Sequence, residues 1–195
     1  MHRFLTVFLA LSLVCLAPAA LGNWTIDNEQ SRLSFVSIKA GTIAEVHHFG
    51  ELQGVLANDG QFELVINLDS VETLIPIRNE RMREMLFDTA KHPEAKLSAQ
   101  LDLAPFRALA VGEQTEIAAE AQLELSGRTS MLTVQAVVAR LADDKLLVTS
   151  MQPLTLNADM LGLGEGVEAL REIAGLPSIS PAVPVTFRLT LVEDH

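Results

Sequence analysis

Cysteine is almost absent from this 195-residue chain. The single cysteine, Cys15, lies in an apolar run near the N-terminus, and we expect this run to be removed from the mature protein. The folded part then contains no disulfide and must be stabilised by a hydrophobic core. Tyrosine is missing as well, and the chain has eight phenylalanines and one tryptophan. Small and medium aliphatic side chains are therefore expected to fill most inward-facing positions.

Positive charge is also scarce. The chain has 14 Lys and Arg residues against 25 Asp and Glu residues, a formal net charge of −11. Such an acidic surface argues against nucleic acid and against an anionic membrane face as standing partners. An apolar ligand held inside the protein is compatible with this charge.

Motifs for catalysis and metal binding are lacking. Ser126-Gly127 has no glycine two residues before the serine, as a nucleophile elbow requires, and no phosphate-loop or dinucleotide glycine pattern occurs. His47 and His48 are neighbours, so on a strand they point to opposite faces and do not converge on one metal ion. We interpret them as surface or loop-mouth histidines. We expect no enzyme, no catalytic residue, no metal site and no required cofactor.

The N-terminus has the three parts of a secretory signal peptide. Arg3 is basic, residues 4–16 are mostly apolar, and residues 17–22 are mostly small. The apolar run is shorter than the roughly 20 residues that span a bilayer, and the alternatives to a signal peptide are a permanent anchor or a buried core helix. We predict cleavage after Gly22, with Ala19 as the other candidate, so residues 1–22 are the signal and residues 23–195 one domain. The protein is then periplasmic, or secreted if its source is not a Gram-negative bacterium.

Alternation of apolar and polar residues dominates the rest of the chain and is typical of strands. Asn58-Asp59-Gly60 is a strong hairpin signal between two such segments. We predict an antiparallel meander of eight or nine strands, at residues 24–26, 33–39, around 49–56, 62–68, 97–103, 117–125, 131–141, 146–154 and 185–191. Apolar residues at helical spacing predict two short amphipathic helices, at 77–87 and 165–174.

A meander of this size either closes into a barrel or packs as a sandwich. Inward positions with small side chains, such as Ala119 and Ala121, leave room inside a barrel of about eight strands. We favour an all-β barrel with a cavity, and a sandwich with a packed core is the alternative. Three arginines, Arg78, Arg81 and Arg83, could meet an anionic headgroup at a barrel mouth. The alternative is ion pairing with the nearby acids Glu80, Glu84 and Asp88.

Several short stretches occur in a specific order and spacing along the chain: Trp24-Thr25-Ile26-Asp27, Phe49-Gly50, Ser70-Val71-Glu72-Thr73, Arg78-Asn79-Glu80, Leu86-Phe87-Asp88, His92-Pro93-Glu94, Leu123-Glu124-Leu125-Ser126-Gly127-Arg128-Thr129 and Asp159-Met160-Leu161-Gly162. The most telling of them is Ser70-Val71-Glu72-Thr73. Together, in this order, they resemble the YceI-like family of polyisoprenoid-binding periplasmic proteins. The resemblance covers essentially the whole chain after the signal segment.

The resemblance implies an elongated, eight-stranded, antiparallel lipocalin-like barrel that holds a long isoprenoid, either a quinone or a polyprenyl phosphate. We therefore expect an exported carrier or sequestering protein for such a lipid. The candidate partners are the lipid, a membrane donor or acceptor, and a second copy of the chain. Arg78 and Arg81 are the candidate headgroup contacts. The candidate cavity-lining residues are Phe35, Phe49, Phe62, Leu64, Ile66, Leu101, Leu123 and Phe187.

A second hypothesis comes from another functional class. A barrel or sandwich with a filled core would act through its surface, as an interaction module in envelope assembly or stress response, without a stoichiometric ligand. An internal apolar cavity favours the carrier, and a packed interior favours the module.

Overall fold

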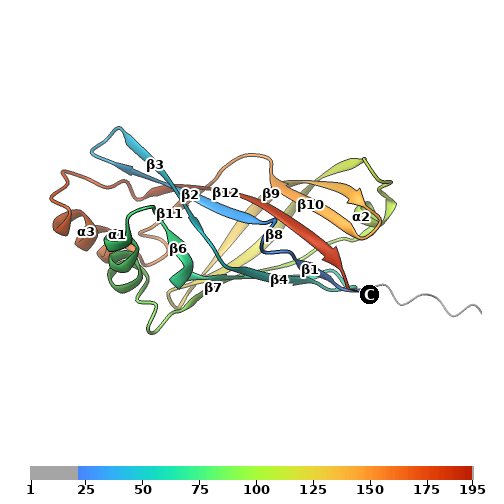
Figure 1. Ribbon diagram of the computed structural model, residues 1–195, viewed down its shortest axis with the longest axis horizontal. Coiled ribbons are helices and arrows are strands. Elements are labelled where there is room, and N and C mark those ends of the chain that lie inside the picture. Colours follow the sequence, from blue (N-terminus) through green and yellow to red (C-terminus); the bar gives the residue numbers. More distant parts are fainter. Residues whose placement is uncertain (1–21, 195) are drawn as a thin grey trace, which may run out of the picture.

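The computed structural model describes residues 22–194, and one antiparallel sheet makes up most of it (Figure 1). The predicted signal segment 1–22 lies outside the described residues, apart from Gly22. Among residues 22–194, no helix is long and apolar enough to cross a membrane. The twelve strands are β1 (Trp24–Ile26), β2 (Arg32–Lys39), β3 (Ile43–Phe49), β4 (Leu52–Leu56), β5 (Gln61–Asn67), β6 (Val71–Glu72), β7 (Glu94–Gln100), β8 (Gln114–Leu125), β9 (Arg128–Ala142), β10 (Lys145–Ser150), β11 (Leu154–Asn157) and β12 (Ala182–Glu193).

These strands form a closed barrel of eight positions. Four positions hold two short strands end to end, because β1 and β2 both pair with one edge of β12, and β10 and β11 with its other edge. In the same way β3 and β4 share a position, and so do β5 and β6. The positions follow chain order, and the pairing of β12 with β1 closes the ring. The predicted eight-stranded antiparallel barrel is confirmed.

Polar side chains satisfy the backbone where the barrel strands are interrupted. The Asn28 side chain donates to the carbonyl of Gly50 at 3.1 Å and accepts from the amide of Leu52 at 2.7 Å. On the other side, Ser70 Oγ accepts from the amides of Gly50 and Glu51, at 3.1 and 3.0 Å. Unpaired backbone groups are costly when water is excluded, so these contacts allow three neighbouring strands to break at the same level.

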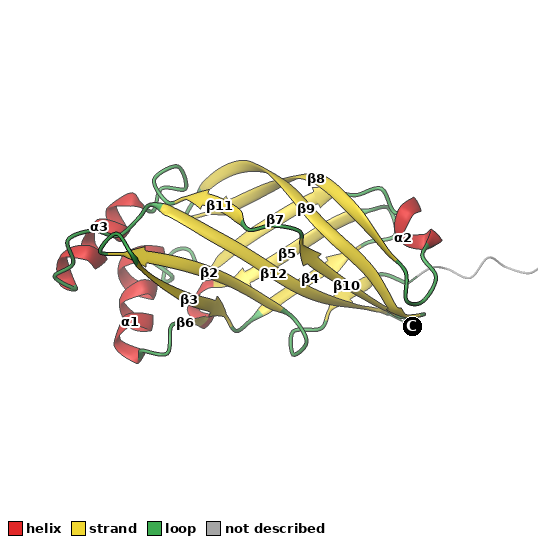
Figure 2. Ribbon diagram, turned by 90° about the horizontal axis from the view of Figure 1, so that it is seen from above, coloured by secondary structure: helices red, strands yellow, loops and turns green. Residues whose placement is uncertain are grey.

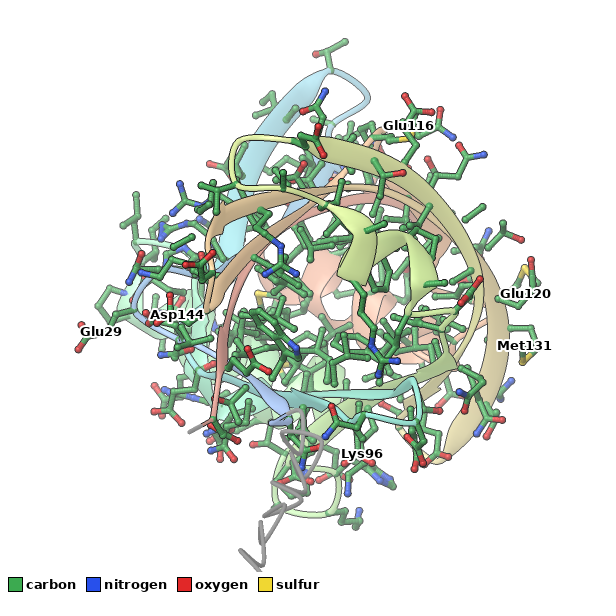
Figure 3. All side chains as sticks on the ribbon, turned by 90° about the vertical axis from the view of Figure 1, so that its right-hand side faces the viewer. Glu29, Lys96, Glu116, Glu120, Met131 and Asp144 are labelled. Carbon is green, nitrogen blue, oxygen red and sulfur yellow. The ribbon has the colours of Figure 1, made fainter. Side chains whose placement is uncertain are left out.

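Strand alternation separates an apolar interior from a charged exterior. On β8, Ala121 and Leu123 are buried while Glu116 and Glu120 are exposed. Figure 3 looks along the barrel and shows Glu116, Glu120 and Met131 projecting outward from its wall. The excess of acidic residues in the composition is therefore found on the outer surface of the barrel.

The helices lie at the two ends of the barrel (Figure 2). Helix α1 (Pro76–Arg81) continues into a π-helical turn, η2 (Met82–Phe87), and lies at the same end as α3 (Gly164–Ile173). A side-chain carbon at Gly166 would come within 2.6 Å of the Met85 carbonyl oxygen, so glycine permits α3 and η2 to pack backbone to backbone. Both predicted helices are confirmed within one residue. Helix α2 (Ala104–Ala108) lies at the opposite end, and a 3₁₀ turn, η1 (Leu68–Ser70), precedes β6.

Three predicted strands are divided or end earlier than expected, and the others differ from the observed bounds by at most three residues. The strand expected around 49–56 is two strands that meet at Gly50-Glu51, and its first part, β3, begins at Ile43. The strand expected at 97–103 ends at Gln100, because the chain turns there into α2. The strand expected at 146–154 breaks after Ser150, near Pro153, which has no amide hydrogen for a sheet.

Candidate ligand cavity

The barrel interior is hollow. A cavity of about 540 Å³ is lined by side chains from the barrel strands and from the helices at both ends. This volume is in the range of small-molecule sites, which are typically about 300 to 1,000 Å³. Among the described residues that line it, the polar side chains are Ser37, Lys39, Glu45, His47, Arg78, Arg81 and Ser180. The filled core of the interaction-module hypothesis does not fit this structure.

All the residues predicted to line a cavity do line it. Three phenylalanines from two strands and η2 form a chain of ring contacts, with centroids of Phe35 and Phe49 at 5.4 Å and those of Phe49 and Phe87 at 5.9 Å. Leu101 lies in the loop after β7 rather than on a strand, but it still reaches the cavity. Whether these side chains bind a ligand stays a prediction. The predicted set is Phe35, Phe49, Phe62, Leu64, Ile66, Leu101, Leu123 and Phe187.

The two ends of the cavity differ in polarity. At the α2 end, the buried ring of Phe106 lines the cavity, and Arg140 Nη2 holds α2 by donating to the Phe106 carbonyl at 3.1 Å. At the opposite end, the last inward positions of β2 and the first of β3 are polar, with Ser37 directly opposite Glu45. An amphipathic molecule would therefore place its apolar part toward α2 and its polar part toward α1.

An ion cluster joins this polar end to helix α1. Glu45 Oε2 lies 2.7 Å from Lys39 Nζ and 2.6 Å from Arg78 Nη1. Arg78 Nη2 also donates to the carbonyl of Thr73 at 2.7 Å. The hydrogen bond from Lys39, followed by that from Arg78, lowers the pKa of the Glu45 carboxyl, so Glu45 is ionised at neutral pH. We call Lys39, Glu45 and Arg78 the rim ion cluster.

His47 lies just inside the rim ion cluster. It is only 2% exposed, its Nε2 is 2.8 Å from Ser37 Oγ, and its ring centroid is 5.2 Å from that of Phe35. Burial, and then the nearby Arg78 charge, lower the pKa of His47, so the imidazole is neutral at neutral pH. The interpretation of His47 as a surface or loop-mouth histidine is wrong. Its neighbour His48 does not line the cavity, as expected for adjacent strand residues.

The arginines of the first helix have separate roles. Arg78 pairs with Glu45 on β3 rather than with the acids near it in sequence. Arg81 lines the cavity, and within residues 22–194 its guanidinium makes no ion pair and no hydrogen bond. Arg83 does not line the cavity and donates to the carbonyl of Asp69 at 3.2 Å. A headgroup role for Arg78 and Arg81 stays a prediction, and Arg81 is the one with free hydrogen-bonding capacity.

Sequence reasoning missed Ser37, Lys39, Glu45 and His47 as cavity residues. The signal that could have found them is the continued alternation in β2 and β3, where Phe35 and Phe49 share the inward face of these polar residues. In the described part of the chain, no group of three or more His, Cys, Asp or Glu side chains is placed to hold a metal ion.

Comparisons with known proteins agree with this architecture. A family model described as the YceI-like domain matches residues 24–191. A solved polyisoprenoid-binding domain from Saccharophagus degradans, implicated in plant cell wall breakdown, is 38% identical, with a TM-score of 0.87 over 90% of this chain and 100% of that one.

More distant structures share the fold alone. BcnA from Burkholderia cenocepacia is 17% identical, with a TM-score of 0.64 over 85% of this chain and 98% of its own. A YceI protein from Campylobacter jejuni is 11% identical, with a TM-score of 0.56 over 76% of this chain and 85% of its own. A search of curated proteins found no match.

Proposed function

The chain belongs to the YceI-like family, and we propose that it binds one long isoprenoid lipid inside its barrel and carries or sequesters it. The observation that carries this proposal is the cavity of about 540 Å³, which is lined almost entirely by aliphatic and aromatic side chains. A water-soluble ligand would leave its polar groups unpaired in such an interior. A hydrocarbon tail has no polar groups to leave unpaired there, and its transfer out of water is favourable.

The gain from burying such a tail is large enough for stable binding. Each buried CH₂ contributes about 0.8 kcal/mol, so a dozen contribute roughly 10 kcal/mol before the cost of ordering the chain. Micromolar affinity requires about 8 kcal/mol, which is within this range. The 12 residues of β8 extend over about 40 Å at the usual rise per residue, which is about 30 Å along the axis of a barrel whose strands tilt by about 40°. This length accommodates an extended tail.

The similarity to the Saccharophagus domain supports an isoprenoid among other long lipids, because that protein is described as polyisoprenoid-binding and is 38% identical over its full length. We place the headgroup at the polar end, near Arg81 and the rim ion cluster. Two headgroup classes suit this end. A quinone would accept hydrogen bonds there, and a polyprenyl phosphate would accept them and also use the free cation of Arg81.

We further propose that this is a binding role outside the cytoplasm rather than a catalytic one. The location rests on the N-terminal segment, whose basic, apolar and small-residue parts are those of a secretory signal. In the periplasm, a carrier would keep a water-insoluble lipid from aggregating between membranes.

The test is to recover the full-length gene product from its native host and measure its mass under native conditions. We expect a stoichiometric adduct that organic solvent removes and that tandem mass spectrometry identifies as an isoprenoid. Delipidated protein should then bind a polyprenyl quinone or a polyprenyl phosphate again. Several preparations without bound lipid, together with delipidated protein that takes up neither compound, would refute the proposal.

A further inference from the structure

The chain between β7 and β8, residues 101–113, lies across the α2 end of the barrel. Figure 3 is viewed from this end, and its yellow-green segment, which contains α2, crosses the opening of the barrel. Four apolar side chains of this segment face the interior. Leu101 and the buried Phe106 line the cavity, while Leu103 and Leu109 pack against the hydrophobic core. We call residues 101–113 the end segment.

Polar contacts fasten the end segment to the barrel. Arg140 Nη2 on β9 donates to the Phe106 carbonyl at 3.1 Å, and the Arg140 guanidinium lies 5.7 Å from the centre of the Trp24 ring on β1. Arg107 Nη2 on α2 donates to the carbonyl of Asn58, in the turn between β4 and β5, at 3.0 Å. One of these contacts is made at the backbone of Phe106 itself. The position of its ring is therefore set by the barrel around it.

The interior beside Phe106 offers only hydrocarbon. Among the described residues, the polar side chains that line the cavity come from β2, β3, α1 and Ser180, just before β12, and none comes from the end segment. A lipid whose headgroup lies at the polar end would reach the α2 end with the last part of its tail. The Phe106 ring is then the side chain that this part of the tail meets.

We propose that Phe106 limits the length of the isoprenoid tail, so that the protein selects lipids by their number of isoprene units. The inference rests on the proposed function, which places the headgroup at the polar end. Each buried CH₂ raises affinity about fourfold until the tail reaches the Phe106 ring. A longer tail must fold back or move the headgroup away from Arg81. A close-packed ring on a fastened backbone does not yield to it.

Competition among lipids of different length tests the inference. Delipidated protein is mixed in detergent with an equimolar series of polyprenyl quinones that differ only in their number of isoprene units. Native mass spectrometry identifies each bound quinone, because every unit adds a fixed mass. For the wild type, we expect occupancy to rise with tail length, to reach a maximum and to fall for longer tails. Comparison between variants cancels the unequal partition of the quinones into detergent.

Substitutions of Phe106 should move this maximum in opposite directions. Phe106→Ala opens volume at the end of the cavity and should raise the relative occupancy of tails longer than the wild-type maximum by about tenfold. Phe106→Trp should favour shorter tails, because its larger side chain extends further into the cavity. Truncation of a buried phenylalanine is destabilising. Phe106→Leu keeps an apolar side chain of shorter reach and should give the same shift as Phe106→Ala to a smaller degree.

Phe87→Ala is the matched control, since Phe87 is also a buried, cavity-lining phenylalanine but lies on η2 at the polar end. It should change the affinity for all tails by a similar factor and leave the preferred length unchanged. An equal shift in Phe87→Ala would overturn the inference, because the limit would then follow from total cavity volume rather than from its end. Unchanged length preference in the folded Phe106 variants would overturn it as well.

The inference and the proposed function fail in different ways. Wild-type protein that binds polyprenyl quinones with an occupancy that rises through the longest tail would refute the length limit alone. Wild-type protein that binds neither these quinones nor polyprenyl phosphates of any length would refute the proposed function, and the length limit with it.

Discussion

Arg78 Nη1 on helix α1 lies 2.6 Å from Glu45 Oε2 on strand β3, so one ion pair joins the helical end of the molecule to the barrel wall. The two residues are 33 positions apart in the sequence. Glu45 also pairs with Lys39 on β2, so the contact connects α1 to both strands of one hairpin. The helix at the polar end of the cavity is thereby fastened to two of the strands that line this end.

Loss of this ion pair should affect ligand exchange more than stability. The partners are partly exposed, so we expect Glu45→Gln to lower the free energy of unfolding by less than about 1 kcal/mol. Dissociation of a bound isoprenoid should accelerate several-fold, because α1 is less firmly held over the polar end of the cavity. Stopped-flow transfer to acceptor vesicles measures the rate. Lys91→Gln removes an exposed ion pair with Asp88 and should leave the rate unchanged.

The buried His47 predicts a specific pH dependence of stability. Its pKa is lowered in the folded state by burial, so the unfolded chain binds the proton more readily. The contribution of His47 to the free energy of unfolding is therefore complete above the pKa of histidine in the unfolded chain, about 6.5, and is lost as the pH falls below that value. The free energy of unfolding, measured with denaturant between neutral pH and about pH 5, should decline less steeply for His47→Gln than for the wild type. Parallel declines would show that His47 protonation does not contribute.

Filling the cavity should block binding without unfolding the protein. Ala119 on β8 lines the cavity and is only half-buried, so its methyl group borders open space. Ala119→Phe should keep the melting temperature within a few degrees and reduce isoprenoid affinity by at least about tenfold, because the ring occupies volume that the tail needs. The neighbouring Ala118 is exposed on the outer face, so Ala118→Phe should bind normally. Equal affinity of both variants would place the ligand elsewhere.

Arg81 should distinguish the two headgroup classes. Its side chain lines the cavity and has no partner within the described chain, so it is available to a phosphate. Charge-assisted hydrogen bonds contribute about 1.5 to 3 kcal/mol, so Arg81→Gln should weaken binding of a polyprenyl phosphate by roughly ten- to hundredfold. Binding of a polyprenyl quinone with the same tail should change little. Arg83→Gln is the control, since Arg83 contacts the Asp69 carbonyl instead. Equal losses for both lipids would assign Arg81 a structural role.

Much of the barrel could be predicted because its determinants are local. The Asn58-Asp59-Gly60 turn predicted a hairpin, and Leu56 does pair with Phe62. The alternation in β5 and β8 identified their inward faces, which line the cavity. A period of two follows from backbone geometry alone, and it is therefore readable without knowledge of the partner strand.

Strand β3 was missed for a physical reason. Its outward residue Val46 is apolar and 69% exposed, whereas its inward residues Glu45 and His47 are polar. This reverses the usual order of polar and apolar side chains on a barrel strand, because this part of β3 lies at the polar end of the cavity. Local rules fail where a strand places polar side chains inside a barrel and an apolar side chain outside it.

The sequence by itself determined the order of the strands, the apolar character of their inward faces and the acidic exterior. These are properties of short segments, and each segment carries them without its neighbours. Only the tertiary structure decided that β12 closes on β1, that the closed barrel remains hollow, and that Glu45 meets Arg78 at the polar end of the cavity. Closure depends on the tilt and stagger of all strands together, and no local period encodes either quantity.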